Sequence, residues 1–173
     1  MEKNLNYSLI NNNDFEKIID FFFEKNQKRT EIFSDENIKK IINENLSFKC
    51  SIINKNKDKK EEEEIISVVL LTKKEKNILI FLIKVKKEYR RKGIGSRIIK
   101  ESIENAKSFF KNKNEEIYFS LHVNLNNTIA LNMYKKLGFV IDKYLENFYV
   151  NMIPKGKEKE IGKCYHAYEM ILK

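Results

Sequence analysis

The strongest constraint on the fold is a strand, a basic turn and a helix that follow one another in the middle of the chain. The apolar run Ile78–Ile83 predicts a buried strand. Ile99, Ile103 and Ala106 then recur at helical spacing, with Phe110 one turn further on, and predict an amphipathic helix. The first turn of a helix offers free N–H groups and a dipole that favours an anion. The unit therefore has the geometry of a phosphate-binding turn.

The turn itself carries the residue types that a phosphate site needs. Three consecutive cations supply positive charge, and two glycines let a ligand approach the backbone. No Gly-Lys-Ser/Thr closes the turn, so it is not a Walker loop, and the third glycine of a dinucleotide fingerprint is missing. The residues expected to bind phosphate are Arg90, Arg91, Lys92, Gly93, Ile94, Gly95 and Ser96.

A second segment, Ser120–Phe139, makes the assignment specific. It reads as a strand ending in Leu-His-Val, followed by Asn-x-x-Ala-x-x-x-Tyr-x-x-x-Gly-Phe. Together with the Arg-x-x-Gly-x-Gly turn, it resembles the GCN5-related N-acetyltransferases (GNAT), whose turn binds the pyrophosphate of acetyl-coenzyme A (acetyl-CoA). Within that family the chain is similar to the catalytic subunits of protein N-terminal acetyltransferases, chiefly the NatE and NatF types. Ala167–Met170 looks more like the NatA and NatB types.

The resemblance implies the GNAT acyl-CoA N-acyltransferase fold, a mixed central β-sheet with helices on both faces. At 173 residues we expect a single domain, 1–173, in which the charged run 55–64 is a flexible, solvated loop. Besides the central strand and helix, the expected strands are 6–10, 48–53, 65–71, 117–123, 140–145 and 163–171. The first expected helix has Phe15, Ile18, Ile19 and Phe22 on one face and follows a cap at Asn13 or Asp14. A second helix is expected over 33–45, with Ser34 or Asp35 as its cap. A third is expected over 128–137 and ends at Gly138.

Acetyl transfer to an amine needs a neutral amine, a polarised thioester and a proton for the leaving thiolate, without a metal. In the resembled family the histidine of Leu-His-Val is a general base that acts through water, which implies this role for His122. The family tyrosine matched by Tyr134 lies at the coenzyme sulfur, which implies that Tyr134 protonates the thiolate or orients the thioester. The simpler alternatives are a polar residue at a sheet edge and an aromatic residue of the core.

The resemblance also implies which further residues contact the cofactor. The backbone of Ile83, Lys84 and Val85 is expected to lie beside the pantetheine. Asn127 is expected to hydrogen-bond the cofactor and, from its position, to cap the helix that follows. Ala130 is expected to contact the cofactor from the same helix.

The expected acceptor is the α-amine of a protein N-terminus, with Met followed by an apolar residue preferred. Two positions depart from the NatE and NatF pattern. Leu79 stands where those enzymes have a tyrosine that assists the histidine, and Tyr118 is a candidate to take over that role. The segment 28–33 lacks their Phe-Pro-x-x-Tyr substrate loop. An apolar wall for the peptide is expected from Phe33, Phe81, Phe148 and Tyr149.

The net charge of +9 has a local explanation. Basic residues gather between Lys84 and Lys100, where Glu88 is the single acid. Aromatic residues do not alternate with these basic residues as they would on a surface that binds single-stranded nucleic acid. The basic cluster therefore suits the phosphates of the coenzyme better than nucleic acid. Cys50 and Cys164 show no metal or redox spacing, and no apolar run approaches the roughly 20 residues of a membrane span. We expect a cytosolic enzyme that uses acetyl-CoA and no metal, with protein N-terminal peptides as partners and an auxiliary subunit or the ribosome as a docking partner.

Two other functions stay open on the sequence. The chain could acetylate lysine side chains or a small amine with the same fold. It could also be a weakly active binding subunit of a larger acetyltransferase complex, which the loss of the tyrosine at Leu79 and the basic surface favour. Turnover with short peptides separates the second alternative from the enzymes.

Overall fold

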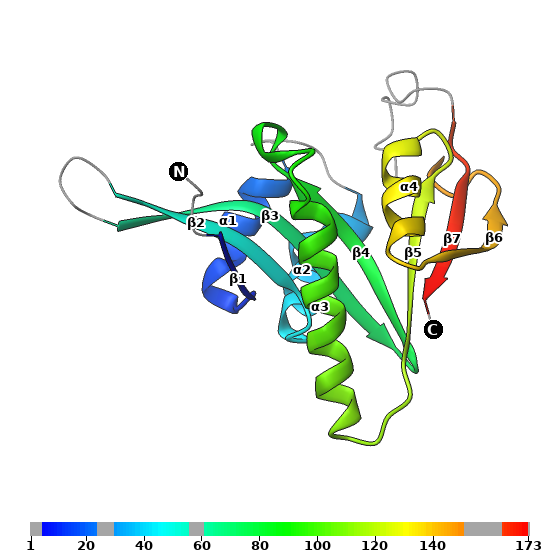
Figure 1. Cartoon of the computed structure of the whole chain (residues 1–173), viewed down its shortest axis with the longest axis horizontal. Helices are drawn as coiled ribbons and strands as arrows, with labels where there is room; N and C mark the ends of the chain where they lie inside the picture. Colours follow the sequence, from blue (N-terminus) through cyan, green and yellow to red (C-terminus); the bar gives the residue numbers. More distant parts are fainter. Residues whose placement is uncertain (1–4, 24–29, 56–60, 151–163, 173) are drawn as a thin grey trace.

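The computed structural model describes residues 5–23, 30–55, 61–150 and 164–172. Over these ranges seven strands form one sheet in the order β1-β2-β3-β4-β5-β7-β6 (Figure 1). Neighbouring strands are antiparallel except β4 and β5, which are parallel. The strands are β1 (Leu5–Leu9), β2 (Phe48–Lys55), β3 (Glu61–Lys74), β4 (Asn77–Val85), β5 (Tyr118–Asn124), β6 (Val140–Leu145) and β7 (Ala167–Leu172).

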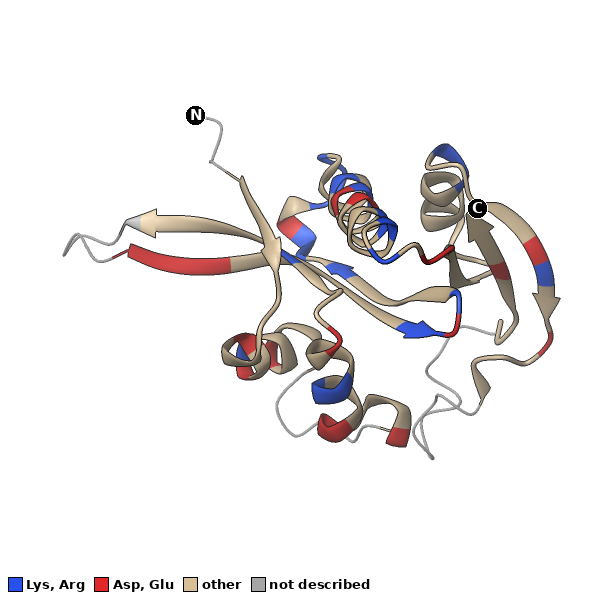
Figure 2. Cartoon of the chain, turned by 90° about the horizontal axis from the view of Figure 1, so that it is seen from below, with Lys and Arg blue, Asp and Glu red and all other residues tan. Residues whose placement is uncertain are grey.

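Helices cover both faces of this sheet, as Figure 2 shows. On one face lie α1 (Phe15–Phe22) and α2 (Asp35–Asn43), and on the other lie α3 (Ile94–Lys111) and α4 (Thr128–Lys136). Short 3-10 turns precede three of them: η1 (Asn12–Asp14), η2 (Glu31–Phe33) and η3 (Lys87–Tyr89). The predicted fold class, a mixed sheet with helices on both faces, is confirmed.

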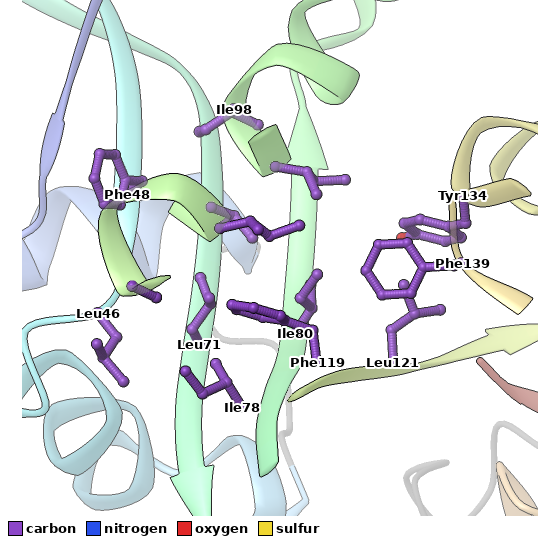
Figure 3. Close-up of a cluster of buried hydrophobic side chains, with 14 of the residues drawn as sticks. Leu46, Phe48, Leu71, Ile78, Ile80, Ile98, Phe119, Leu121, Tyr134 and Phe139 are labelled. Carbon is purple, nitrogen blue, oxygen red and sulfur yellow. The ribbon is translucent and has the colours of Figure 1, made fainter. Parts of the chain in front are cut away.

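Each face of the sheet has its own apolar cluster. The larger cluster lies under α3 and α4 and includes Ile98, Phe119 and Phe139 (Figure 3). The smaller cluster lies under α1 and α2 and includes Ile18 and Ile38. The helical spacing that predicted α3 reflects burial in the larger cluster, because all four residues of the pattern are buried there: Ile99, Ile103, Ala106 and Phe110.

Two predicted helix ends are confirmed. Ser34 Oγ accepts a hydrogen bond from Asn37 N at 3.3 Å and so caps α2, although the helix begins at Asp35 rather than at Phe33. Gly138 follows α4 with a φ of +92°, a conformation that residues with a Cβ rarely adopt.

Asp14 holds the N-cap position of α1, as predicted, but its side chain makes no capping hydrogen bond to that helix. Asn11 is the capping residue, and it caps η1: its Oδ1 accepts from Asn13 N at 2.9 Å, while the Asp14 carboxylate accepts from Asn11 N at 3.1 Å. Asp14 also pairs with Lys49 of β2, whose Nζ lies 2.6 Å from Asp14 Oδ1. The carboxylate is thus used in a buried ion pair with a distant strand, which a local pattern does not reveal.

The charged run 55–64 is only partly a loop, contrary to the prediction. Glu61–Glu64 form the start of β3 and pair with the end of β2. Glu63 lies 2.9 Å from Lys49 Nζ, and Glu64 lies 2.9 Å from Lys86 Nζ. These two lysines come from other parts of the chain, and they neutralise Glu63 and Glu64 in a way that local composition cannot show. Residues 56–60 of the run lie outside the described residues.

Three further observations concern the class of protein. Cys50 is buried, Cys164 is half-buried, and both are free thiols. Within the described ranges, no group of three or more His, Cys, Asp or Glu residues is placed to hold a metal ion. In the same part of the chain, no helix combines the length and the apolar character that crossing a membrane requires.

Candidate functional site

β4 and β5 are paired only along the first part of their lengths. Their parallel register joins Asn77–Ile80 to Tyr118–Leu121. Beyond it, β5 continues against β7 and β4 continues against β3, so the two strands diverge (Figure 1). The predicted cofactor strand Ile83–Val85 lies along the edge of this V-shaped opening.

A β-bulge lies where the opening begins. The register between β3 and β4 shifts by one residue at Phe81, between the pairs made by Ile80 and Leu82. Ile80 packs into the cluster under α3, whereas Phe81 and Leu82 both pack against the cluster under α1 and α2. Ile83 and Val85 then return to the α3 side. The bulge thus decides which side chains of β4 face each side of the opening.

The N-terminus of α3 lies beside the end of β4. A Cβ added at Gly95 would be 3.4 Å from Met133 Sδ and 3.5 Å from Val85 Cγ2, so the start of α3 packs against both α4 and β4. Arg91 and Gly93 have φ values of 60° and 76°, which turn the chain into the helix. The first turn of α3 contains no acidic residue. Its free N–H groups and the helix dipole therefore suit an anion.

The basic side chains near the turn do not all point toward it. Arg90 Nε donates to Val85 O at 3.0 Å, which ties the guanidinium to the end of β4. Lys84 Nζ donates instead to Phe22 O at 3.2 Å, at the last residue of α1. The Lys84 side chain is thus directed away from the phosphate turn, and only its backbone follows the opening. The exposed cations of the turn are Arg90, Arg91 and Lys92.

The remaining predicted cofactor residues lie near two helix N-termini. Ile94 is buried in the larger cluster, so only its backbone is available to a ligand, and Ser96 is half-buried in the same turn. Asn127 Oδ1 accepts from Ala130 N at 3.2 Å, which confirms its predicted role as the cap of α4. Asn127 and Ala130 follow the end of β5, on the other side of the opening from β4.

His122 is half-buried on β5, in the part that has separated from β4. Its ring lies 4.3 Å from the ring of Phe148, with 35° between the planes. Burial lowers the pKa of His122 below its ordinary value of 6.5, and the Glu169 carboxylate, opposite it on β7, acts against this shift. The lowered pKa keeps the imidazole neutral near pH 7, so it can accept a proton.

Tyr134 is buried on α4, where its ring packs edge-on against Phe139 at 5.9 Å (Figure 3). Burial raises the pKa of Tyr134 to about 12, and the nearby Tyr149 adds to the shift. The phenol therefore keeps its proton at neutral pH and is a potential proton donor.

These two side chains approach the opening from opposite faces of the sheet. Leu121 and Val123 belong to the cluster under α3 and α4, as does Tyr134. Because side chains alternate along a strand, His122 lies on the other face, the one covered by α1 and α2. Phe81 is on that face as well. A proton acceptor and a proton donor thus flank the opening from different sides.

The four residues predicted to form an apolar wall lie in two aromatic pairs. Phe33, in η2, lies 5.8 Å from Phe81 between ring centroids. Phe148 lies 5.1 Å from Tyr149 in an edge-on contact and also contacts His122. All four side chains of the pairs are half-buried. The first pair comes from the α1 and α2 side of the sheet, and the second comes from the turn after β6.

Sequence reasoning missed one electrostatic partner and overrated one substitute. Glu169 faces His122 because β5 pairs with β7 in this register. The Ala-Tyr-Glu-Met segment, which contains Glu169, was the sequence signal that could have indicated this partner. Tyr118 pairs with Asn77 at the closed end of β5. It is four residues from His122, about 13 Å along the strand. It is therefore badly placed to replace the tyrosine missing at Leu79.

The sequence matches the acetyltransferase (GNAT) family over residues 15–139. It is 39% identical over 69 residues to an N-alpha-acetyltransferase of Sulfurisphaera tokodaii, a match covering 40% of this chain and 39% of that protein. It is 36% identical over 72 residues to N-alpha-acetyltransferase 30 of Xenopus laevis, covering 42% of this chain and 24% of that protein. The matches thus span less than half the length of these relatives.

A solved structure extends the likeness to the whole chain. The crystal structure of the NatC complex bound to Gag peptide and CoA contains a chain with a TM-score of 0.69 to this one. The superposition covers 98% of both chains at 17% sequence identity. At this identity the likeness shows the fold.

Proposed function

The chain belongs to the GNAT family of acetyltransferases, and on this premise we propose that it transfers the acetyl group of acetyl-CoA to the α-amine of protein N-termini. One observation carries the proposal. The opening between β4 and β5 is bordered by a helix N-terminus suited to phosphate, by the neutral imidazole of His122 and by the protonated phenol of Tyr134. The two relatives named N-alpha-acetyltransferases support the choice of acceptor.

The residues around the opening fit acetyl-CoA, which supplies the thioester when bound. The turn before α3 combines exposed cations with a helix start that lacks acids, so we assign the pyrophosphate to the backbone of Gly93–Ser96 and to the side chains beside it. The edge of Ile83–Val85 would line the pantetheine, with Asn127 and Ala130 on the opposite border.

Proton transfer is divided between the two sides of the sheet. His122 takes a proton from the acceptor amine, directly or through a water, because its lowered pKa keeps it in the basic form. Tyr134 keeps its proton up to high pH and gives it to the departing sulfur. Since Phe81 and His122 share the α1 and α2 face, the acceptor peptide belongs on that face.

The state of His122 favours an α-amine over a lysine side chain. An α-amine has a pKa of about 8, against about 10.4 for lysine, so its neutral form is roughly 250 times more populated near neutral pH. An imidazole whose pKa is lowered is a weak base, and it suits an acceptor that is already partly neutral. We therefore place N-termini ahead of lysines as substrates.

The aromatic pairs lead us to propose Met followed by an apolar residue as the preferred N-terminus. Fully burying an apolar side chain against them would contribute about 1.5–3 kcal/mol. An acidic side chain there would lose its hydration without gaining an evident cation. A cytosolic location and an auxiliary subunit or ribosome as docking partner remain part of the proposal.

The test is kcat/KM with acetyl-CoA for four peptides: Met-Leu, Met-Glu, Ser-Glu, and a peptide that is blocked at its N-terminus but carries lysine. We expect Met-Leu to be the best substrate. Preference for the blocked peptide would reject the α-amine, and preference for Met-Glu would reject only the apolar pocket. Binding of acetyl-CoA without turnover of any peptide would identify a binding subunit.

A further inference from the structure

The segment Cys164–His166, called the strap below, is fastened to the end of β5. Asn124 Nδ2 donates to Cys164 O at 2.7 Å. Leu125 N, one residue further along, donates to His166 O at 3.4 Å. The strap leads directly into β7, so these bonds fix it to the strand that carries the proposed general base.

The strap also holds the turn that carries Phe148 and Tyr149. Tyr149 N donates to Tyr165 O at 2.9 Å, and Asn147 N donates to His166 Nδ1 at 3.2 Å. Asn147 has a φ of +51°, in the left-handed region that asparagine adopts more readily than most other residues with a Cβ. The bond from Asn147 to His166 therefore holds a left-handed residue immediately before the aromatic pair.

The imidazole of His166 makes two different contacts. Its face stacks on Tyr144 of β6, with 5.5 Å between centroids and 26° between planes. Its Nδ1 accepts the bond from Asn147, so in the neutral ring the proton lies on Nε2. Of the four bonds described above, this one alone uses a side-chain acceptor. A substitution can therefore remove it without disturbing the backbone.

We propose that His166 is a positioning residue, which fixes Phe148 and Tyr149 for binding of the acceptor peptide. The inference rests on the proposed function, because it gives that pair the role of a peptide wall. Phe148 contacts His122, so a shift of the turn would move the wall beside the proposed base. The phosphate turn before α3 belongs to a different part of the site. Loss of the His166 bond should therefore weaken peptide binding and leave acetyl-CoA binding unchanged.

Two variants separate the acceptor atom from the ring. His166→Phe keeps a ring that can stack on Tyr144 but removes the acceptor. His166→Asn loses the ring but keeps an acceptor oxygen close to the position of Nδ1. In steady-state kinetics with a Met-Leu peptide, His166→Phe should raise the peptide KM about threefold to tenfold, the effect of one exposed hydrogen bond. His166→Asn should restore most of this loss, and the KM for acetyl-CoA should stay the same in both.

Three kinetic results would overturn the inference: a peptide KM unchanged in His166→Phe, an equal rise in both variants, or a parallel rise in the KM for acetyl-CoA. A second measurement does not depend on turnover. Amide hydrogen exchange at Asn147 and Tyr149 should be faster in His166→Phe than in the wild type or in His166→Asn. If the wild type acetylates no peptide, the proposed function fails while exchange still decides the role of His166. Unchanged exchange in His166→Phe would show that the turn is held without it.

Discussion

Tyr134 offers a sharp test of the proposed chemistry, because a proton donor must remain protonated in the folded protein. Its side chain is 5% exposed, and burial raises its pKa from 10.0 to about 12. A folded-state pKa above the unfolded value means that the folded protein holds this proton more tightly. The stabilisation is fully present below pH 10 and is lost as the pH rises through about 12.

The size of the effect follows from the shift. The pKa moves from 10.0 to about 12, and each unit corresponds to about 1.4 kcal/mol. The free energy of unfolding should therefore fall by about 3 kcal/mol in the alkaline limit, with about half of this lost by pH 11. Tyr134→Phe has no group to ionise at this position, so the variant should be spared this part of the loss.

The assay is urea unfolding, followed by circular dichroism, at pH 8 and pH 11. The loss of unfolding free energy between the two should be about 1–1.5 kcal/mol larger in the wild type than in Tyr134→Phe. Tyr118→Phe, which removes an exposed hydroxyl from β5, controls for the replacement of a tyrosine. Equal losses in the wild type and Tyr134→Phe would mean that burial does not hold this proton, and would refute the reasoning.

Cofactor binding, base catalysis and a buried ion pair give further tests. Acetyl-CoA at about 100 times its Kd should stabilise the fold by roughly 2.7 kcal/mol. A rise in Tm should report this, and Gly95→Glu should abolish the rise by placing a carboxylate at the phosphate turn; no rise in the wild type would contradict the site. His122→Ala should lower kcat about 100-fold. Because burial lowers the pKa of His122, wild-type kcat should stay constant as the pH is lowered to 6.5 and fall only below it. A fall in kcat that begins above pH 6.5 would count against His122 as the base. Lys49→Met should reduce the free energy of unfolding by about 3–5 kcal/mol in urea, since it leaves the buried Asp14 without its cation. A loss under about 1 kcal/mol would show that the pair is not needed.

The helices next to the site could be predicted because their signals are local. The apolar spacing of α3 and the Asn127 and Gly138 ends of α4 depend on residues within one or two turns. The Gly-rich turn before α3 is local as well, so its place at a helix N-terminus followed from the sequence. Charge neutralisation is not local. In the strand Glu61–Glu64, Glu63 pairs with Lys49 of β2 and Glu64 pairs with Lys86, just after β4, whereas local composition indicated a loop.

The direction of side chains on β4 could not be predicted from alternation. The bulge at Phe81 inserts one residue, so each later side chain moves to the opposite face from the one that a regular strand would give it. This places the Lys84 side chain against the end of α1. Its charge had suggested a place near the proposed phosphate turn, and the side chain points away from that turn. A bulge is a property of the pairing between β3 and β4, and neither strand encodes it alone.

Short motifs with fixed spacing were enough to identify the family and to indicate the proposed phosphate turn and the two residues proposed to move protons. Tertiary structure decided what those residues can do. It separated β4 from β5, placed His122 and Tyr134 on opposite faces, and moved their pKa values in opposite directions through burial. It also brought His166 to Asn147 across 19 residues of chain. Burial, strand pairing and contacts between distant segments exist only once the chain is folded, so no local pattern contains them.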